Sequence, residues 1–175
     1  HIHYNDINAK NIVFAEGFGI KENPFFSNLP LNGVKGELLV IYAPDLKLKV
    51  ILKSSIFVVP IGNDRYIIGS TYTWDDYSNL PTEPARVIIK KKLEQLLSCS
   101  FEILHQKAGI RPTVIDRRPL VGRHELYKNI YILNGLGSRG VLIAPTIAKD
   151  LIAFIEDSIP LSIDIDIKRF QKKAH

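Results

Sequence analysis

The sequence predicts an α/β fold with α+β character, in which a mixed or antiparallel sheet carries one helix and both chain ends contribute a second layer. Three observations favour this fold. Apolar, β-branched runs separated by turn residues fill residues 35–73, two segments repeat apolar residues at helical spacing, and a short buried-type strand stands near each end. With 175 residues, 46% of them apolar, the chain is long enough for a sizeable core.

The first half of the chain is expected to be mostly strand. A strand over residues 12–15 ends at Gly17 and Gly19, which are typical of a turn. Further strands are expected at 38–42, 48–52, 56–59 and 66–68. Between the last two, the run Gly-Asn-Asp at 62–64 is a good hairpin signal, so the central block should be antiparallel.

The second half adds two helices and one strand. Thr82 is a fair N-cap for a helix over 83–98, whose apolar residues recur on one face. A strand over 129–134 runs through a glycine-rich turn into a second helix over 141–157, which ends before Pro160. The tail from residue 162 to 175 alternates isoleucines with polar residues and reads as a strand or an extended arm.

Composition and charge narrow the class of protein. The single cysteine, Cys99, excludes an intramolecular disulfide and a cysteine-cluster metal site, and no apolar run approaches the ~20 residues that span a bilayer. We therefore expect a cytoplasmic protein without membrane contact. A net charge of +5 attracts anions in general and selects no partner. The sequence has no methionine, so we expect it to be a piece of a longer polypeptide.

The strand, glycine turn and helix from residue 130 to 155 are the strongest functional feature. Glycines before a helix N-terminus let a ligand approach unpaired N–H groups, which suits an anionic or electron-rich group. Gly135, Gly137 and Gly140 have the spacing G-x-G-x-x-G, but no acidic residue follows at the expected distance, so the dinucleotide fingerprint is weak. A tight turn that needs positive φ is the alternative explanation.

Arg111 is the second functional feature, because Gly109 and Pro112 present it on a stiff backbone. Its planar guanidinium suits bidentate binding of a carboxylate. A structural ion pair with Asp116 or another acid is the alternative.

Taken in order, these motifs resemble the D-amino-acid-oxidase-like FAD-dependent oxidoreductases, which include glycine and sarcosine oxidases. The matching segments are Gly-Ile-Arg-Pro at 109–112, Asp116, Pro-Leu-Val-Gly at 119–122, the turn at 135–140, Ala-Pro at 144–145 and Arg-Phe at 169–170. Residues 13–17 resemble the strand that ends in an Ala-Thr-Gly turn in that family, with Glu16 in place of Thr, and residues 69–71 resemble a strand end that enters the substrate cavity.

The turn Gly-Leu-Gly-Ser-Arg-Gly at 135–140 is most similar to one branch of this family, the oxidase domain of the bifunctional enzyme that modifies wobble uridine in tRNA. The resemblance covers nearly the whole chain, as the C-terminal half of such a protein. The N-terminal strand–glycine–helix unit that grips the ADP part of FAD is absent from this chain.

The resemblance implies FAD as the cofactor and a site built from two groups of residues. The residues implied to bind the cofactor are Ala15, Gly17, Gly135, Gly137, Ser138, Arg139, Gly140, Val141 and Leu142. Arg111 is implied to bind the substrate carboxylate, and Tyr72 is a candidate wall of the substrate pocket. No side chain is assigned as a catalytic acid or base, and no metal site is expected.

The domain organisation follows from the same resemblance. Residues 1–22 and 123–175 are expected to be the remaining part of a Rossmann-like FAD-binding layer, and residues 23–122 the substrate-binding domain. The expected function is oxidation of the C–N bond of an amino acid or related secondary amine that carries a carboxylate. The alternatives are a flavin-dependent oxidase that acts on carboxymethylaminomethyl-modified tRNA, and a non-catalytic binding module that has lost the cofactor site.

Overall fold

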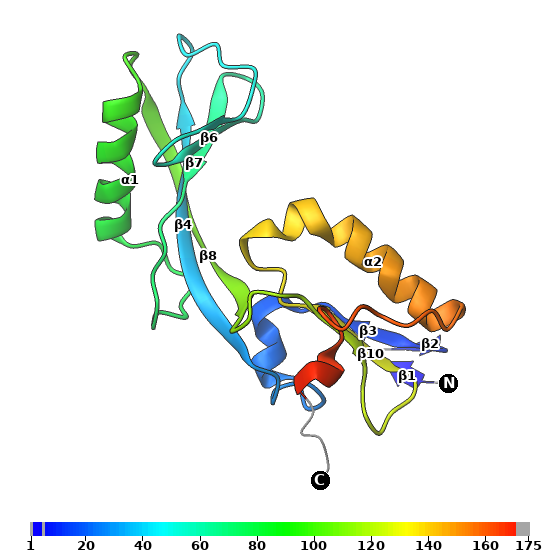
Figure 1. The fold of residues 1–175 in the computed structure, drawn as a ribbon. Helices are drawn as coiled ribbons and strands as arrows, with labels where there is room; N and C mark the ends of the chain where they lie inside the picture. The colour runs from blue at the N-terminus through cyan, green and yellow to red at the C-terminus, as the bar shows by residue number, and fades with distance from the viewer. Residues whose placement is uncertain (1, 5, 171–175) are drawn as a thin grey trace. The chain divides into compact units, whose positions relative to one another are not determined.

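The computed structural model describes residues 2–4 and 6–170 (Figure 1). The chain forms two compact units, one from the two chain ends (up to Asn32 and from Arg111) and one from Gly33–Ile110. The sequence places the divisions at 22/23 and 122/123, whereas the compact units divide at 32/33 and 110/111. Both division points fall inside long strands, β4 (Leu31–Tyr42) and β8 (Glu102–Val114). The roles assigned to the two domains remain predictions.

A three-stranded sheet with the strand order β3-β10-β9 forms the centre of the unit made by the chain ends. β3 (Ile12–Phe14) runs parallel to β10 (Ile130–Asn134), and the other edge of β10 pairs antiparallel with β9 (Leu120–Arg123). Segments from the two ends of the chain therefore share one sheet, as the sequence predicts. A separate hairpin, β1 (Ile2–Tyr4) and β2 (Ile7–Ala9), belongs to the same unit.

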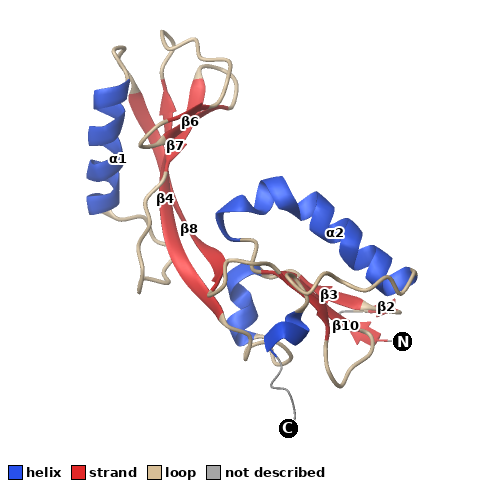
Figure 2. Ribbon diagram, in the orientation of Figure 1, coloured by secondary structure: helices blue, strands red, loops and turns tan. Residues whose placement is uncertain are grey.

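The two faces of this sheet bury different side chains, because successive strand residues point to opposite sides. On one face Tyr131 packs with Ile147 and Leu151 of α2 (Gly140–Glu156). On the other face Ile132 packs with residues of two 3-10 helices, η1 (Gly17–Glu22) and η3 (Ile167–Phe170). The helical segments of both faces are blue in Figure 2.

The second unit is a five-stranded sheet in the order β5-β6-β7-β4-β8, with α1 (Glu83–Leu96) packed on it. β5 (Leu52–Lys53), β6 (Phe57–Pro60) and β7 (Arg65–Gly69) follow one another as antiparallel neighbours, and β7 pairs antiparallel with β4. The core contains Leu39 and Ile68 from the sheet and Ile89 and Leu93 from the helix, each at most 1% exposed.

The structure confirms the predicted fold class and both predicted helices. It also confirms the hairpin between β6 and β7, where Gly62, Asn63 and Asp64 all have positive φ. Thr82 is the N-cap residue of α1, but its hydroxyl donates to Glu37 Oε1 at 2.7 Å instead of capping the helix.

Two predicted elements are wrong, and one strand was not predicted. The strand expected at 48–52 is reduced to β5, which begins at Leu52. The tail is neither a strand nor an extended arm where it is described, since it forms η3 and one isolated bridge between Asp166 and Val121; residues 171–175 lie outside the described part. The 13-residue β8 was not predicted, because glycine and proline within it are typical strand breakers.

No helix in the described ranges is both long enough and apolar enough to cross a lipid bilayer.

Candidate functional site

The turn after β10 holds two glycines in the left-handed region, Gly135 at φ +69° and Gly137 at φ +58°. Their surroundings differ. A Cβ on Gly135 would collide with Cγ2 of Val114, whereas a Cβ on Gly137 would have only the carbonyl oxygen of Pro112 nearby, at 4.0 Å. Packing alone therefore excludes a side chain at Gly135, while the space beside Gly137 is open.

The turn after β3 lies next to this one. Ala15 is exposed, and Gly17 has φ +62° with no atom within 4 Å of the place a Cβ would take. Asn134, the last residue of β10, donates from Nδ2 to the carbonyl oxygen of Gly17 at 2.9 Å. The two turns, 117 residues apart in the sequence, are thus joined by a direct hydrogen bond.

The start of α2 adds an electropositive end with apolar side chains. No side chain caps η2 (Gly137–Arg139) or α2, and the first turn of α2 has no acidic residue. The first N–H groups of a helix lack intrahelical partners and carry about half a positive charge. Val141 and Leu142 are 100% and 80% exposed, and Ser138 is also exposed. This end of the helix can receive a flat apolar ligand that has an electron-rich edge.

Arg139 has a structural partner. Its Nη2 donates to the carbonyl oxygen of Arg117 at 3.0 Å, which ties the turn after β10 to the loop after β8. The cofactor-binding role expected for Arg139 remains a prediction beside this observed contact.

Arg111 lies on β8, one residue before Pro112, whose carbonyl oxygen faces the open space at Gly137. The backbone that carries Arg111 therefore runs beside the glycine turn. Arg111 as a whole is half-buried. Arg111 and the glycine turn belong to the same compact unit, whereas the division expected from the sequence places Arg111 in the substrate-binding domain.

Asp116, one of the acids considered as an ion-pair partner of Arg111, pairs with Arg169. The Asp116 carboxylate accepts from Nε of Arg169 at 2.8 Å and from its Nη2 at 3.3 Å, and it also accepts from the Arg118 amide at 3.0 Å. Partial burial raises the pKa of Asp116, but these hydrogen bonds outweigh burial and hold the pKa below its ordinary value. Arg169 also stacks over the Phe170 ring at 4.4 Å, so the closing Arg-Phe pair anchors this loop.

Tyr72 belongs to the other unit, on the loop after β7, and is 64% exposed. The loop is fastened to β4, because Thr73 and Lys35 exchange backbone hydrogen bonds of 2.9 Å and Lys35 Nζ donates to Asp76 Oδ2 at 2.6 Å. The hydrogen bond from Lys35 and the Ser78 amide lower the pKa of Asp76 to about 2. Tyr72 is among the residues that line a pocket of about 580 Å³ within this unit.

Two buried charged side chains behind this loop were not predicted from the sequence. Lys35 and Glu37 are 0% and 1% exposed. Glu37 accepts from the amide and hydroxyl of Thr82, each at 2.7 Å, and from Gln106 Nε2 at 2.8 Å. Side chains from three separate segments meet here, and a single sequence does not show which segments become neighbours.

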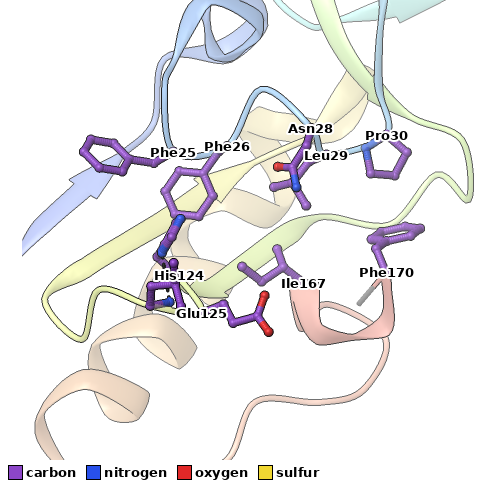
Figure 3. A pocket seen from close by; sticks show the side chains of 10 residues that line it. Phe25, Phe26, Asn28, Leu29, Pro30, His124, Glu125, Ile167 and Phe170 are labelled. Carbon is purple, nitrogen blue, oxygen red and sulfur yellow. Dashed lines mark hydrogen bonds between the residues drawn. The ribbon is translucent and has the colours of Figure 1, made fainter. Parts of the chain in front are cut away.

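A further pocket of about 790 Å³ contains none of the predicted site residues (Figure 3). Phe25, Phe26 and Phe170 are among the residues that line it, together with Glu125. The His124 ring packs against Phe25 and Phe26, and its Nδ1 accepts from two backbone amides at 3.1 and 3.2 Å. These contacts give His124 a structural role as the centre of an aromatic cluster.

This geometry, two glycine turns side by side at the carboxyl ends of parallel strands, defines a nucleotide- or cofactor-binding class of α/β protein. Residues 3–154 match the family model described as "FAD dependent oxidoreductase", so the chain belongs to that family.

The curated relatives are oxidases and a bifunctional tRNA-modification protein. The chain is 30% identical over 147 residues to glycine oxidase of Bacillus subtilis (strain 168), which covers 80% of the chain and 39% of the relative. It is 30% identical over 162 residues to the tRNA 5-methylaminomethyl-2-thiouridine biosynthesis bifunctional protein MnmC of Nitrosospira multiformis, which covers 84% of the chain and 26% of the relative. The chain thus spans well under half the length of these relatives.

Solved structures share the fold. Glycine oxidase from Geobacillus kaustophilus superposes with a TM-score of 0.75 at 22% identity, over 95% of this chain and 46% of that one. L-proline dehydrogenase from P. horikoshii gives a TM-score of 0.78 at 18% identity, over 91% and 46%. At these identities the likeness establishes the fold alone.

The residues present fit the flavin of FAD. Gly17 and Gly137 leave open space beside the backbone, although only their φ values, and no neighbouring side chain, require glycine. Val141 and Leu142 expose apolar surface at the positive end of α2. A flat ring system with an electron-rich edge matches both features.

Proposed function

We propose that the protein oxidises the C–N bond of a small amino acid or related secondary amine, with FAD as its cofactor. The observation that carries this proposal is the hydrogen-bonded pair of glycine turns, with the Arg111 strand running beside the second turn. Family membership supports it, and related proteins bear the names glycine oxidase and iminodiacetate oxidase. When bound, FAD would supply the two-electron chemistry.

The turn residues would hold and tune the flavin. Backbone N–H groups around Gly137 and Ser138, with the α2 N-terminus behind them, place positive potential where the reduced cofactor carries negative charge. Val141 and Leu142 would cover the ring and keep water away from it.

Arg111 would bind the carboxylate of the substrate. Its planar fork of donors holds a carboxylate in one orientation and so aligns the amine-bearing carbon with the cofactor, which is a positioning effect. Tyr72 lies in the other unit, and the role in substrate binding expected for it remains a prediction. No side chain need act as an acid or base if the amine arrives neutral.

The visible spectrum of the complete gene product tests the cofactor assignment. A yellow protein, or one that becomes yellow on reconstitution with FAD, is expected. A protein that stays colourless would overturn the proposal and favour the non-catalytic binding module.

An Arg111→Ala variant tests the substrate assignment, with Arg123→Ala, an exposed arginine of the same unit, as the matched control. The KM for glycine or N-methylglycine should rise by about 30-fold or more in Arg111→Ala, since losing a charge-assisted pair in a complex costs ~2–5 kcal/mol. The control should leave KM unchanged. An amine substrate without a carboxylate should not distinguish the variants, and equal KM values for the carboxylate substrates would refute the role of Arg111.

A second candidate function is oxidation of a carboxymethylaminomethyl group on tRNA. It is favoured by the Gly-Leu-Gly-Ser-Arg-Gly turn, the net charge of +5 and the MnmC relatives. Binding of the complete gene product to tRNA that weakens steeply with added salt would support it. Absence of binding at low salt would remove it.

A further inference from the structure

The side chain of Asn134 joins the two glycine turns, and no sequence motif marks it. It is 3% exposed at the end of β10. Its Nδ2 donates to the carbonyl oxygen of Gly17 at 2.9 Å, and its Oδ1 accepts from the amide of Gly135 at 2.8 Å. One carboxamide therefore holds a backbone group of each turn.

The position of Asn134 explains why a side chain is needed to connect the two turns. The parallel pairing of β10 with β3 ends at Ile132 and Phe14, two residues before Asn134. Beyond that point each strand continues into its turn, and the pairing of β3 with β10 has ended. The carboxamide continues the connection, because it has both a donor and an acceptor, as a peptide group does.

Both groups that Asn134 holds belong to glycines in the left-handed region, at φ +62° and +69°. Glycine is the most flexible residue, so these turns need outside contacts to keep one geometry. A buried amide with both ends satisfied provides such contacts, and removing it would leave the Gly17 carbonyl oxygen and the Gly135 amide without this partner.

We propose that Asn134 is a positioning residue of the cofactor site, which sets the spacing between the Gly17 and Gly137 turns; this rests on the proposed FAD site. Asn134 does not need to touch the flavin itself. It acts through the backbone of both turns, whose separation determines whether the ring can lie between the open faces of the two glycines.

The same pair of strands offers a matched control. Asn129, at the opposite end of β10, donates from Nδ2 to the carbonyl oxygen of Lys10 at 2.9 Å, again joining the segments that carry β10 and β3. Asn129→Ala removes one bond of the same type between the same segments, away from the turns. Asn129→Ala therefore controls for the loss of an asparagine bond between these two segments, and hydrogen exchange at Gly135 reports on the Asn134 bridge itself.

The test measures FAD binding and hydrogen exchange in the complete gene product carrying Asn134→Ala, Asn134→Asp or Asn129→Ala. The FAD dissociation constant should rise at least about tenfold in Asn134→Ala, which loses both bonds, and further in Asn134→Asp, because a carboxylate oxygen, which only accepts, would then face the Gly17 carbonyl oxygen and repel it. Asn129→Ala should change it less than twofold. Exchange of the Gly135 amide should accelerate in Asn134→Ala and stay slow in Asn134→Asp, which retains the acceptor.

The outcomes separate this inference from the proposed function. If the wild-type protein binds FAD and Asn134→Ala binds it within twofold as tightly, the positioning role is refuted. If Gly135 exchange is unchanged in Asn134→Ala, the bridge itself is refuted. A wild-type protein that binds no FAD refutes the proposed function, and with it the cofactor role of Asn134, while the exchange result still reports on the bridge.

Discussion

Gly135→Ala should mainly lower stability and Gly137→Ala should mainly weaken FAD binding, although both residues have left-handed backbone. A side chain in that conformation costs about 1–2 kcal/mol of stability. At Gly137 no steric cost adds to this conformational cost, because a Cβ there would lie 4.0 Å from its nearest neighbour. At Gly135 the Cβ would also collide with Val114, and overpacking of that kind adds about 1–3 kcal/mol.

Gly135→Ala should therefore lower the free energy of unfolding by about 2–5 kcal/mol, against about 1–2 kcal/mol for Gly137→Ala. Urea unfolding followed by circular dichroism measures both values. FAD titration should reverse the ranking among folded molecules. A methyl group at residue 137 would fill the space assigned to the flavin and raise the dissociation constant at least about tenfold, or about 1.4 kcal/mol. Gly17→Ala, at the other open glycine, should behave like Gly137→Ala.

Two results would refute this reasoning. Equal loss of stability at Gly135 and Gly137 would mean that the contact with Val114 relaxes without cost. Unchanged FAD affinity in Gly137→Ala, with the wild-type protein binding FAD, would mean that the flavin does not lie against this turn.

Three further predictions concern charge and packing. Partial burial raises the pKa of Asp116, but its hydrogen bonds to Arg169 and Arg118 have the larger effect and leave the folded-state pKa below the unfolded value. The carboxylate therefore stabilises the fold at pH values above its unfolded pKa, and this contribution is lost as the pH falls through the folded pKa. Asp116→Asn should make the free energy of unfolding less dependent on pH in the acid range. Lys35→Met should raise the pKa of Asp76 from about 2 toward its ordinary value, as measured by NMR titration. Leu93→Ala, at a fully buried site on α1, should lower the free energy of unfolding by about 2–5 kcal/mol, and a loss below 1 kcal/mol would contradict the packing described.

Features set by neighbouring residues were predictable from the sequence. The Gly-Asn-Asp run predicts the β6–β7 hairpin because its residues tolerate positive φ, which is a local property. Helical spacing of apolar residues predicts α1 and α2 for the same reason. Gly135 and Gly137 also predict a turn with left-handed backbone.

Features that depend on distant partners were not predictable. Asp116 pairs with Arg169, which lies 53 residues away in the sequence. In the sequence Asn134 resembles an ordinary turn residue, and its hydrogen bond to Gly17 becomes visible only in the folded chain. β8 was not predicted because its pairing in the sheet overrides the local preference of Gly109 and Pro112 against strand structure. The cytoplasmic location and the roles of the site residues remain predictions.

The parallel pairing of β3 with β10 imposes an order on biosynthesis. At about 5–20 residues per second, a ribosome needs roughly 6–23 seconds to travel the 117 residues from Gly17 to Asn134, and among the strands that the structure describes β3 pairs with β10 alone. The antiparallel strands β5, β6 and β7 are neighbours in the chain and can associate while translation continues. β10 is thus the last strand of this sheet to be translated, and its synthesis brings Asn134 next to Gly17.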